Sequence, residues 1–163
     1  MASNLKNLSD HNTQSIPSAV DMRFGIVVSE WNSEITNSLL RGATNTILAS
    51  GAKESNILIS YVPGSFELPH GAQLLIESDE VDAVICLGCI IQGETRHFEF
   101  ICKAVAEGIM NLGLDYNIPV IFGVLTTNTL EQAIDRSGGK HGNKGVEAAV
   151  SAIKMIDLQK DFE

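Results

Sequence analysis

Positive charge is scarce in this chain of 163 residues, which carries 11 lysines and arginines against 20 aspartates and glutamates. The formal net charge is −9 at pH 7. Nucleic acids and acidic membranes are polyanions, so this charge balance argues against both as partners. No apolar run approaches the roughly 18 residues that a membrane-spanning helix needs. We therefore expect neither a nucleic-acid-binding protein nor a membrane protein.

Cysteine is also scarce, and the three thiols, Cys86, Cys89 and Cys102, all lie among apolar neighbours. In an extended strand, Cys86 and Cys89 would point to opposite faces. Buried free thiols are therefore favoured over a redox pair, and they fit a reducing cytoplasm. The chain also lacks metal-ligand spacing and the Gly-x-Gly-x-x-Gly fingerprint of dinucleotide sites. We expect no metal ion and no organic cofactor.

A secretion signal is missing as well, because residues 1–19 are polar, rich in Asn and Ser, and without an apolar core. This composition predicts a flexible N-terminal arm over residues 1–20. The remaining length suits one domain, which we place at residues 21–160.

The chain does contain a regular alternation of apolar runs and helical stripes. The run at 83–91 is unbroken, which indicates a strand buried on both faces, as in parallel sheets. The alternation predicts an α/β fold, a three-layer sandwich around a four-stranded parallel sheet with its site at the carboxyl ends of the strands. Predicted strands cover 23–29, 56–62, 83–91 and 119–125. Predicted helices cover 33–51, 67–77, 97–110, 129–135 and 146–158, with a glycine-rich basic loop at 138–145.

The segment Gly-Glu-Thr-Arg-His at 93–97 follows the third predicted strand. Thr95 is expected to cap a helix whose first turn contains His97. Free N–H groups at a helix start attract phosphate, and histidine moves protons near neutral pH. Equally, Thr95 can be an ordinary cap and His97 a solvent-facing residue. Glu94 counts against an anion site unless only its backbone takes part, so both interpretations stay open.

A second candidate site is the segment 136–145, where Arg136, Lys140, His141 and Lys144 stand among four glycines. Glycines let a backbone approach a ligand closely, and the arginine fork suits phosphate oxygens. The alternative is a solvated basic turn. It is not a phosphate-binding P-loop, because the spacing differs and no strand precedes it.

Aromatic residues and a rigid turn follow the first two predicted strands. Trp31, the only tryptophan, can stack on a planar heterocycle or serve as a core or interface residue. The turn at 63–69 can present backbone groups to a ring, with Glu67 binding hydroxyls. Alternatively, Ser65 caps a helix and Glu67 complements its dipole. Phe122 lies within a predicted strand, which indicates a core or interface position.

Five segments, at 23–32, 62–69, 93–98, 122–126 and 130–145, resemble the lumazine synthase family in sequence and in order. The resemblance covers residues 22–158. It implies a flavodoxin-like, homo-oligomeric enzyme of riboflavin biosynthesis, a cofactor-free transferase in the cytoplasm. The implied reaction joins 5-amino-6-(D-ribitylamino)uracil to 3,4-dihydroxy-2-butanone 4-phosphate and yields 6,7-dimethyl-8-ribityllumazine, phosphate and water.

The resemblance also assigns roles to individual residues. His97 is implied as the proton-transfer residue, with Glu94 and Thr95 as the phosphate seat. From a neighbouring subunit, Phe122 would cover the ring and Arg136 would bind the phosphate, with Lys144 close to the site. The residues implied to hold the uracil and its ribityl chain are Trp31, Ser65, Phe66, Glu67, Cys89, Ile90 and Ile91.

The resemblance also implies an oligomeric assembly, and the sequence differs from the family pattern at two positions. Family members form pentamers, and the short link at 137–143 favours a shell of twelve pentamers, or 60 subunits; riboflavin synthase is a candidate partner. Residues 18–22 are candidates for the family's contact with a neighbour's sheet. Trp31 replaces the usual phenylalanine, which keeps open a riboflavin-binding protein with weak or lost catalysis. Gln92 replaces a frequent arginine and lowers the positive charge near the phosphate seat.

Overall fold

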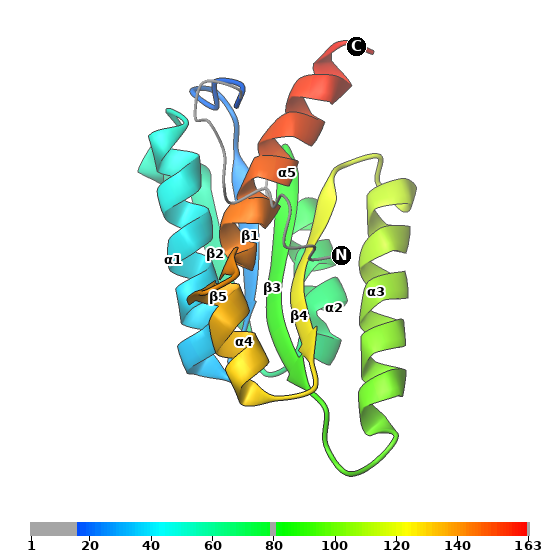
Figure 1. Ribbon diagram of the computed structural model, residues 1–163. Coiled ribbons are helices and arrows are strands. Elements are labelled where there is room, and N and C mark those ends of the chain that lie inside the picture. Colours follow the sequence, from blue (N-terminus) through cyan, green and yellow to red (C-terminus); the bar gives the residue numbers. More distant parts are fainter. Residues whose placement is uncertain (1–15, 79–80, 163) are drawn as a thin grey trace.

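A computed structural model describes residues 16–78 and 81–162 of the chain. In it a four-stranded sheet lies between two layers of helices (Figure 1). The strands are β1 (Phe24–Ser29), β2 (Ile57–Val62), β3 (Ala83–Ile91), β4 (Val120–Thr127), β5 (Ser137–Gly139) and β6 (Gly142–Asn143). The helices are α1 (Ser33–Ala49), η2 (Glu54–Asn56), η3 (Ser65–Glu67), α2 (Leu68–Ser78), α3 (His97–Asp115), α4 (Leu130–Arg136) and α5 (Lys144–Lys160).

The main sheet has the order β2-β1-β3-β4, and all of its neighbouring strands are parallel. Every residue of β1 is buried, as is the first part of β3, because helices cover both faces. One apolar cluster joins the sheet to α1, α4 and α5, and the other joins it to α2 and α3. The predicted three-layer α/β sandwich is therefore confirmed.

Side chains along β3 point alternately to the two faces of the sheet, and so they belong to different clusters. Cys86 belongs to the cluster beneath α2 and α3, and Cys89 to the one beneath α1 and α5. Both thiols are free and buried, as predicted, and Cys102 on α3 is free and half-buried. The parallel strands bring their carboxyl ends to one edge, at the bottom of Figure 1.

Several predicted boundaries shift. The fourth strand continues to Thr127, and the turn after β2 contains the 3₁₀ turn η3 before α2 begins at Leu68. The prediction of a loop over residues 138–145 is wrong, because this segment contains a short hairpin and the start of a helix. Ser137–Gly139 and Gly142–Asn143 pair as an antiparallel hairpin, and α5 begins at Lys144 because Asn143 Oδ1 accepts from the N–H of Gly145 at 2.8 Å.

The predicted N-terminal arm lies mainly outside the described residues, which begin at Ile16. The described part packs on its own chain. Ala19 and Met22 are buried in the core, and the N–H of Ala19 donates to Ser50 O at 2.8 Å. Val20 between them is exposed.

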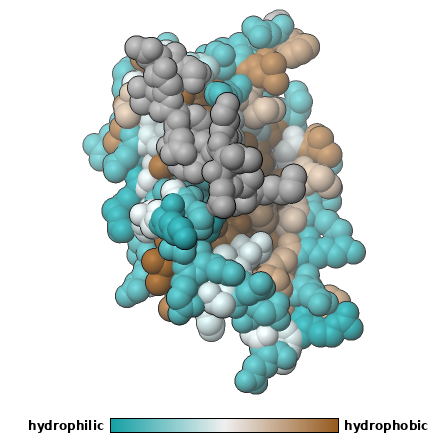
Figure 2. Space-filling view, viewed as in Figure 1, coloured by the Kyte–Doolittle hydropathy of each residue, from teal (hydrophilic) through white to brown (hydrophobic). Residues whose placement is uncertain are grey.

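The surface carries an apolar hollow of about 670 Å³ between the carboxyl ends of α3 and α5. Apolar side chains over this region lie at the upper right of Figure 2. Met110, Leu114 and Phe162 line it and are exposed. None of the helices in the described part of the chain is long and apolar enough to cross a membrane.

Candidate functional site

Trp31 and Glu67 lie close together at the carboxyl ends of β1 and β2. The N–H of Trp31 donates to Pro63 O at 3.3 Å, which ties the end of β1 to the turn after β2. A Cβ atom at Gly64 would lie 3.0 Å from Glu67 Oε2 and 3.7 Å from Trp31 Cδ1. The Trp31 side chain is 72% exposed, so the structure does not support a core role for it. Its face is open to a planar ligand.

The end of β3 joins the same region. Asn32 sits at the start of α1 with φ 57°, and its Nδ2 donates to Cys89 O at 2.9 Å instead of capping the helix. Ser65 lies above β3, since a Cβ atom at Gly88 would be 2.7 Å from Ser65 Oγ. That hydroxyl is buried and has no hydrogen-bond partner in the described structure, so the turn holds an unsatisfied polar group beneath this surface.

Phe66 extends this surface outward and is exposed, while Ile90 and Ile91 are half-buried at the last two positions of β3. We call the carboxyl-end surface the strand-end face. It comprises Trp31, Ser65, Phe66, Glu67, Cys89, Ile90, Ile91, Glu94, Thr95 and His97.

The loop from β3 to α3 carries the exposed part of the strand-end face. His97 is the first residue of α3, as predicted, and its imidazole is exposed. The prediction that Thr95 is the N-cap is wrong by one position. Arg96 holds that place without a side-chain cap, and the Thr95 hydroxyl accepts from the N–H of His97 at 3.4 Å. The first turn of α3 therefore faces solvent at the mouth of the sheet, where its N–H groups are accessible to an anion.

The thiol of Cys89 is protonated rather than reactive. Burial raises its pKa to about 11 and that of Cys86 to about 12, so neither supplies a thiolate near neutral pH. Across residues 16–78 and 81–162, no group of three or more His, Cys, Asp or Glu side chains is arranged to hold a metal ion.

Phe122, Arg136 and Lys144 lie together elsewhere, along β4. They line a second hollow of about 640 Å³, which we call the β4 hollow, between that strand and the segment joining α4 to α5. Thr127 and Gln132 contribute its neutral polar groups. The half-buried Phe122 packs against the core cluster beneath α2 and α3 and also lines this hollow.

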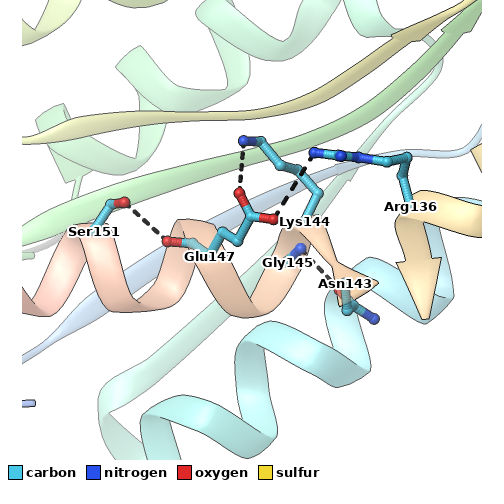
Figure 3. A network of polar contacts seen from close by, with 6 residues as sticks. All are labelled: Arg136, Asn143, Lys144, Gly145, Glu147 and Ser151. Carbon is cyan, nitrogen blue, oxygen red and sulfur yellow. Dashed lines mark hydrogen bonds and ion pairs between the residues drawn. The ribbon is translucent and has the colours of Figure 1, made fainter. Parts of the chain in front are cut away.

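Glu147 organises the charges beside this hollow, as Figure 3 shows. Its Oε2 lies 3.0 Å from Lys144 Nζ, and its Oε1 lies 3.9 Å from an Arg136 guanidinium nitrogen. Its side chain is only 11% exposed, and Oε1 has no hydrogen-bond partner in the described structure. A buried carboxylate needs such cationic partners. The sequence interpretation missed Glu147, although its i,i+3 spacing from Lys144 was a usable signal.

The predicted site residues thus form two groups in one chain. The strand-end face gathers ten of them, and the β4 hollow gathers Phe122, Arg136 and Lys144. None of the strand-end residues is among those lining the β4 hollow. One subunit therefore presents an aromatic platform with a histidine on one surface and a cationic group on another.

Known proteins match nearly the whole length of this chain. Residues 21–160 match the family model described as 6,7-dimethyl-8-ribityllumazine synthase. A relative of that name from Phocaeicola vulgatus is 52% identical over 163 residues, covering 100% of this chain and 97% of the relative. One from Cytophaga hutchinsonii is 58% identical over 156 residues, covering 96% and 98% of the two chains. The chain therefore belongs to the 6,7-dimethyl-8-ribityllumazine synthase family.

Proposed function

We propose that this chain condenses 5-amino-6-(D-ribitylamino)uracil with 3,4-dihydroxy-2-butanone 4-phosphate, releasing 6,7-dimethyl-8-ribityllumazine, phosphate and water. The family match over residues 21–160 carries the proposal. The aromatic, acidic and cationic groups described above are of the kinds that these two substrates require.

The strand-end face binds the uracil in this proposal. Trp31 stacks on the ring, the unpartnered Ser65 hydroxyl and the backbone of the turn bind its polar edge, and Glu67 accepts from ribityl hydroxyls. The close approach of Glu67 and Trp31 across Gly64 supports this division of roles. The half-buried ends of β3 supply apolar contacts that exclude water.

The phosphorylated ketone binds between the start of α3 and a cationic clamp. The open N–H groups of α3 and the Thr95 hydroxyl receive the phosphate together with Arg136. The substrate amine attacks the ketone to form an imine with loss of one water, phosphate leaves, and the ring closes with loss of a second water. Positioning two reactants can supply about 7–11 kcal/mol. His97 moves the protons, a contribution of about 10²–10⁴-fold.

Two subunits contribute to each site in this proposal. The strand-end face of one subunit meets the β4 hollow of a neighbour, so Phe122 covers the ring and Arg136 reaches the phosphate. The exposure of Trp31 and Phe66 and the apolar hollow between α3 and α5 support burial against further copies. We propose a pentamer, and a shell of twelve pentamers because the β5–β6 link is a tight hairpin.

The proposal extends to the cellular compartment and to a partner enzyme. Three free thiols suit the reducing cytoplasm, where we place the enzyme. Riboflavin synthase is the proposed partner, since a lumazine product requires a next enzyme that consumes it.

The experiment mixes the two substrates with the purified protein and follows lumazine absorbance. Turnover that requires both substrates is expected. A riboflavin-binding protein is the second candidate, which the 72% exposure of Trp31 favours. It predicts no turnover together with tight quenching of Trp31 fluorescence by riboflavin, and that result would refute the synthase proposal.

A further inference from the structure

The charges around the β4 hollow cancel. Arg136 and Lys144 bring two positive charges, and Asp135, which also lines the hollow, brings a negative one. Glu147 brings the second negative charge, because it is ion-paired to both cations. A phosphate ester that enters as a dianion would therefore meet a site with no net positive charge. A further cation is needed for strong binding of a dianion.

His141 is the remaining titratable group that lines this hollow. It lies in the turn between β5 and β6, and its N–H donates to Asp135 O at 2.8 Å. Its side chain is half-buried, and an imidazole can become cationic near neutral pH.

The hairpin that carries His141 is firmly attached to α1. Ser38 Oγ donates to Ser137 O, and Asn143 Nδ2 donates to Ser38 O at 3.0 Å. A Cβ atom at Gly42 would lie 2.6 Å from Asn143 Oδ1, so the two elements are in close contact. The position of His141 is therefore set by packed structure rather than by a free loop.

We propose that His141 is a third cationic member of the phosphate clamp and that a dianion binds with the uptake of one proton on its imidazole. The proposal rests on the proposed function, in which the phosphate lies between the start of a neighbour's α3 and the cations of the β4 hollow. The bound dianion favours the charged imidazolium, and Asp135 adds to that attraction. The clamp then carries a net charge of one positive unit.

Charged groups face His141 from two elements. The helix α4 brings Asp135 and Arg136, and α5 brings Lys144 with Glu147 paired to it. Lys140 precedes His141 in the turn, but it is exposed and is not among the residues lining the hollow, so it does not enter the charge balance of the hollow. The β4 residues that line the hollow carry no titratable side chain, and α1 meets the hairpin through Ser38 and Gly42.

The experiment measures sulfate binding by calorimetry at pH 6 and pH 8 on the assembled protein. Sulfate is the probe because it remains a dianion at both pH values, so a pH dependence reports protein groups alone. If sulfate binds with uptake of a proton, the parent protein should bind it about tenfold more tightly at pH 6 than at pH 8, because linkage favours proton-coupled binding at the lower pH. The His141→Gln variant is expected to change by less than about twofold between the two values.

Matched histidine variants separate His141 from other sources of pH dependence. The exposed His70 on α2 serves as control, and His70→Gln should behave like the parent. His141→Asn, with a side chain suited to turns, guards against misfolding of the first variant. The proposal is overturned if both His141 variants keep the tenfold dependence, if His97→Gln alone removes it, or if the parent binds sulfate equally at both pH values.

The synthase assay tests the proposed function, and the sulfate titration tests the role of His141. Absence of lumazine formation by the parent defeats the proposed function, whereas the sulfate titration still decides the role of His141. With an active parent, His141→Gln should raise the KM for the phosphorylated ketone at pH 6 and leave the KM for the uracil unchanged. Equal KM values for the ketone in parent and variant would contradict the proposal.

Discussion

Glu147 determines how the two cations of the β4 hollow are held. Its carboxylate lies 3.0 Å from Lys144 Nζ but 3.9 Å from the nearest Arg136 nitrogen, so the lysine is the more firmly held partner. Arg136 carries five N–H donors, and a pair at 3.9 Å is too long for a hydrogen bond. Arg136 is therefore the cation with donors free to bind an anion.

The first prediction concerns Arg136→Ala. Loss of a charge-assisted fork should raise the KM for the phosphorylated ketone by about 10–100-fold, while the KM for the uracil stays within about twofold. Steady-state kinetics with each substrate varied in turn measure both values. The exposed Arg41 on α1 provides the control, because Arg41→Ala should leave both KM values unchanged. An equal rise in both KM values would show that Arg136 does not act on the phosphate.

The second prediction concerns Glu147→Gln. Removing the carboxylate charge leaves Lys144 and Arg136 without their common partner in a site that is largely buried. Since both cations keep some exposure, the free energy of unfolding should fall by about 1–3 kcal/mol rather than by the full cost of a sealed ion pair. Urea unfolding of the assembled protein measures this change.

An exposed ion pair gives the matched control for Glu147. Lys103 and Glu107 on α3 pair at 3.7 Å with both side chains more than half exposed. The change Glu107→Gln should alter the free energy of unfolding by less than about 0.5 kcal/mol. Equal effects of the two substitutions would mean that the Glu147 carboxylate contributes no more than a surface charge.

Single residues were predicted unevenly from the sequence. His97 falls in the first turn of α3 as expected, because a polar cluster after an apolar run marks a helix start. The N-cap is Arg96 rather than the expected Thr95. The hydroxyl of Thr95, one residue before the N-cap, still accepts from the N–H of His97. No prediction from the sequence covered Glu147, and only the fold shows that its carboxylate lies beside Arg136 and Lys144.

At the scale of elements, α1 and α5 cross where their backbones nearly touch. A Cβ atom at Gly145 would lie 1.9 Å from Leu39 O, and backbone atoms cannot move aside like a flexible side chain. Glycine at the start of α5 is therefore required by close approach rather than by dihedral angle. The same contact positions Lys144 and Glu147 within the first turn of α5.

The third prediction is that Gly145→Ala lowers the free energy of unfolding by about 3 kcal/mol or more, because the added methyl group forces the two helices apart. Gly93→Ala is the control, since a Cβ atom there meets nothing within 4 Å and the glycine has no positive φ. Thermal unfolding of both variants measures the difference. Similar stabilities would contradict the close crossing of α1 and α5.

The main elements were predictable because burial leaves a clear periodic pattern. The continuous apolar run of β3 indicated a strand covered on both faces, and it has that environment. The β5–β6 hairpin was not predictable, because three- and two-residue strands made of Ser, Gly and Asn show no alternation of apolar and polar residues. The hairpin is held instead by contacts with Ser38 and Gly42 of α1, which lie far away in the sequence.

At the scale of the whole molecule, each chain carries two surfaces that are chemically incomplete alone. The strand-end face has the histidine and the stacking platform but only backbone N–H groups and a hydroxyl for an anion. The β4 hollow has the cations but neither Trp31 nor His97 among its lining residues. In the proposed pentamer, a site assembled from both surfaces would take them from two copies of the chain.

The fourth prediction follows from the placement of His97 and Arg136 on different surfaces of the chain. At ketone concentrations well below the raised KM of the Arg136 variant, His97→Ala and Arg136→Ala should each be nearly inactive alone, yet activity should return when the two variants are co-expressed and assemble together. In a random one-to-one ring, a site is intact when the subunit that supplies its histidine is the Arg136 variant and the neighbour is the His97 variant. Each condition holds for half of the positions, so about a quarter of the sites should work. Activity no greater than the sum of the separately purified variants would place both residues of a working site in the same subunit.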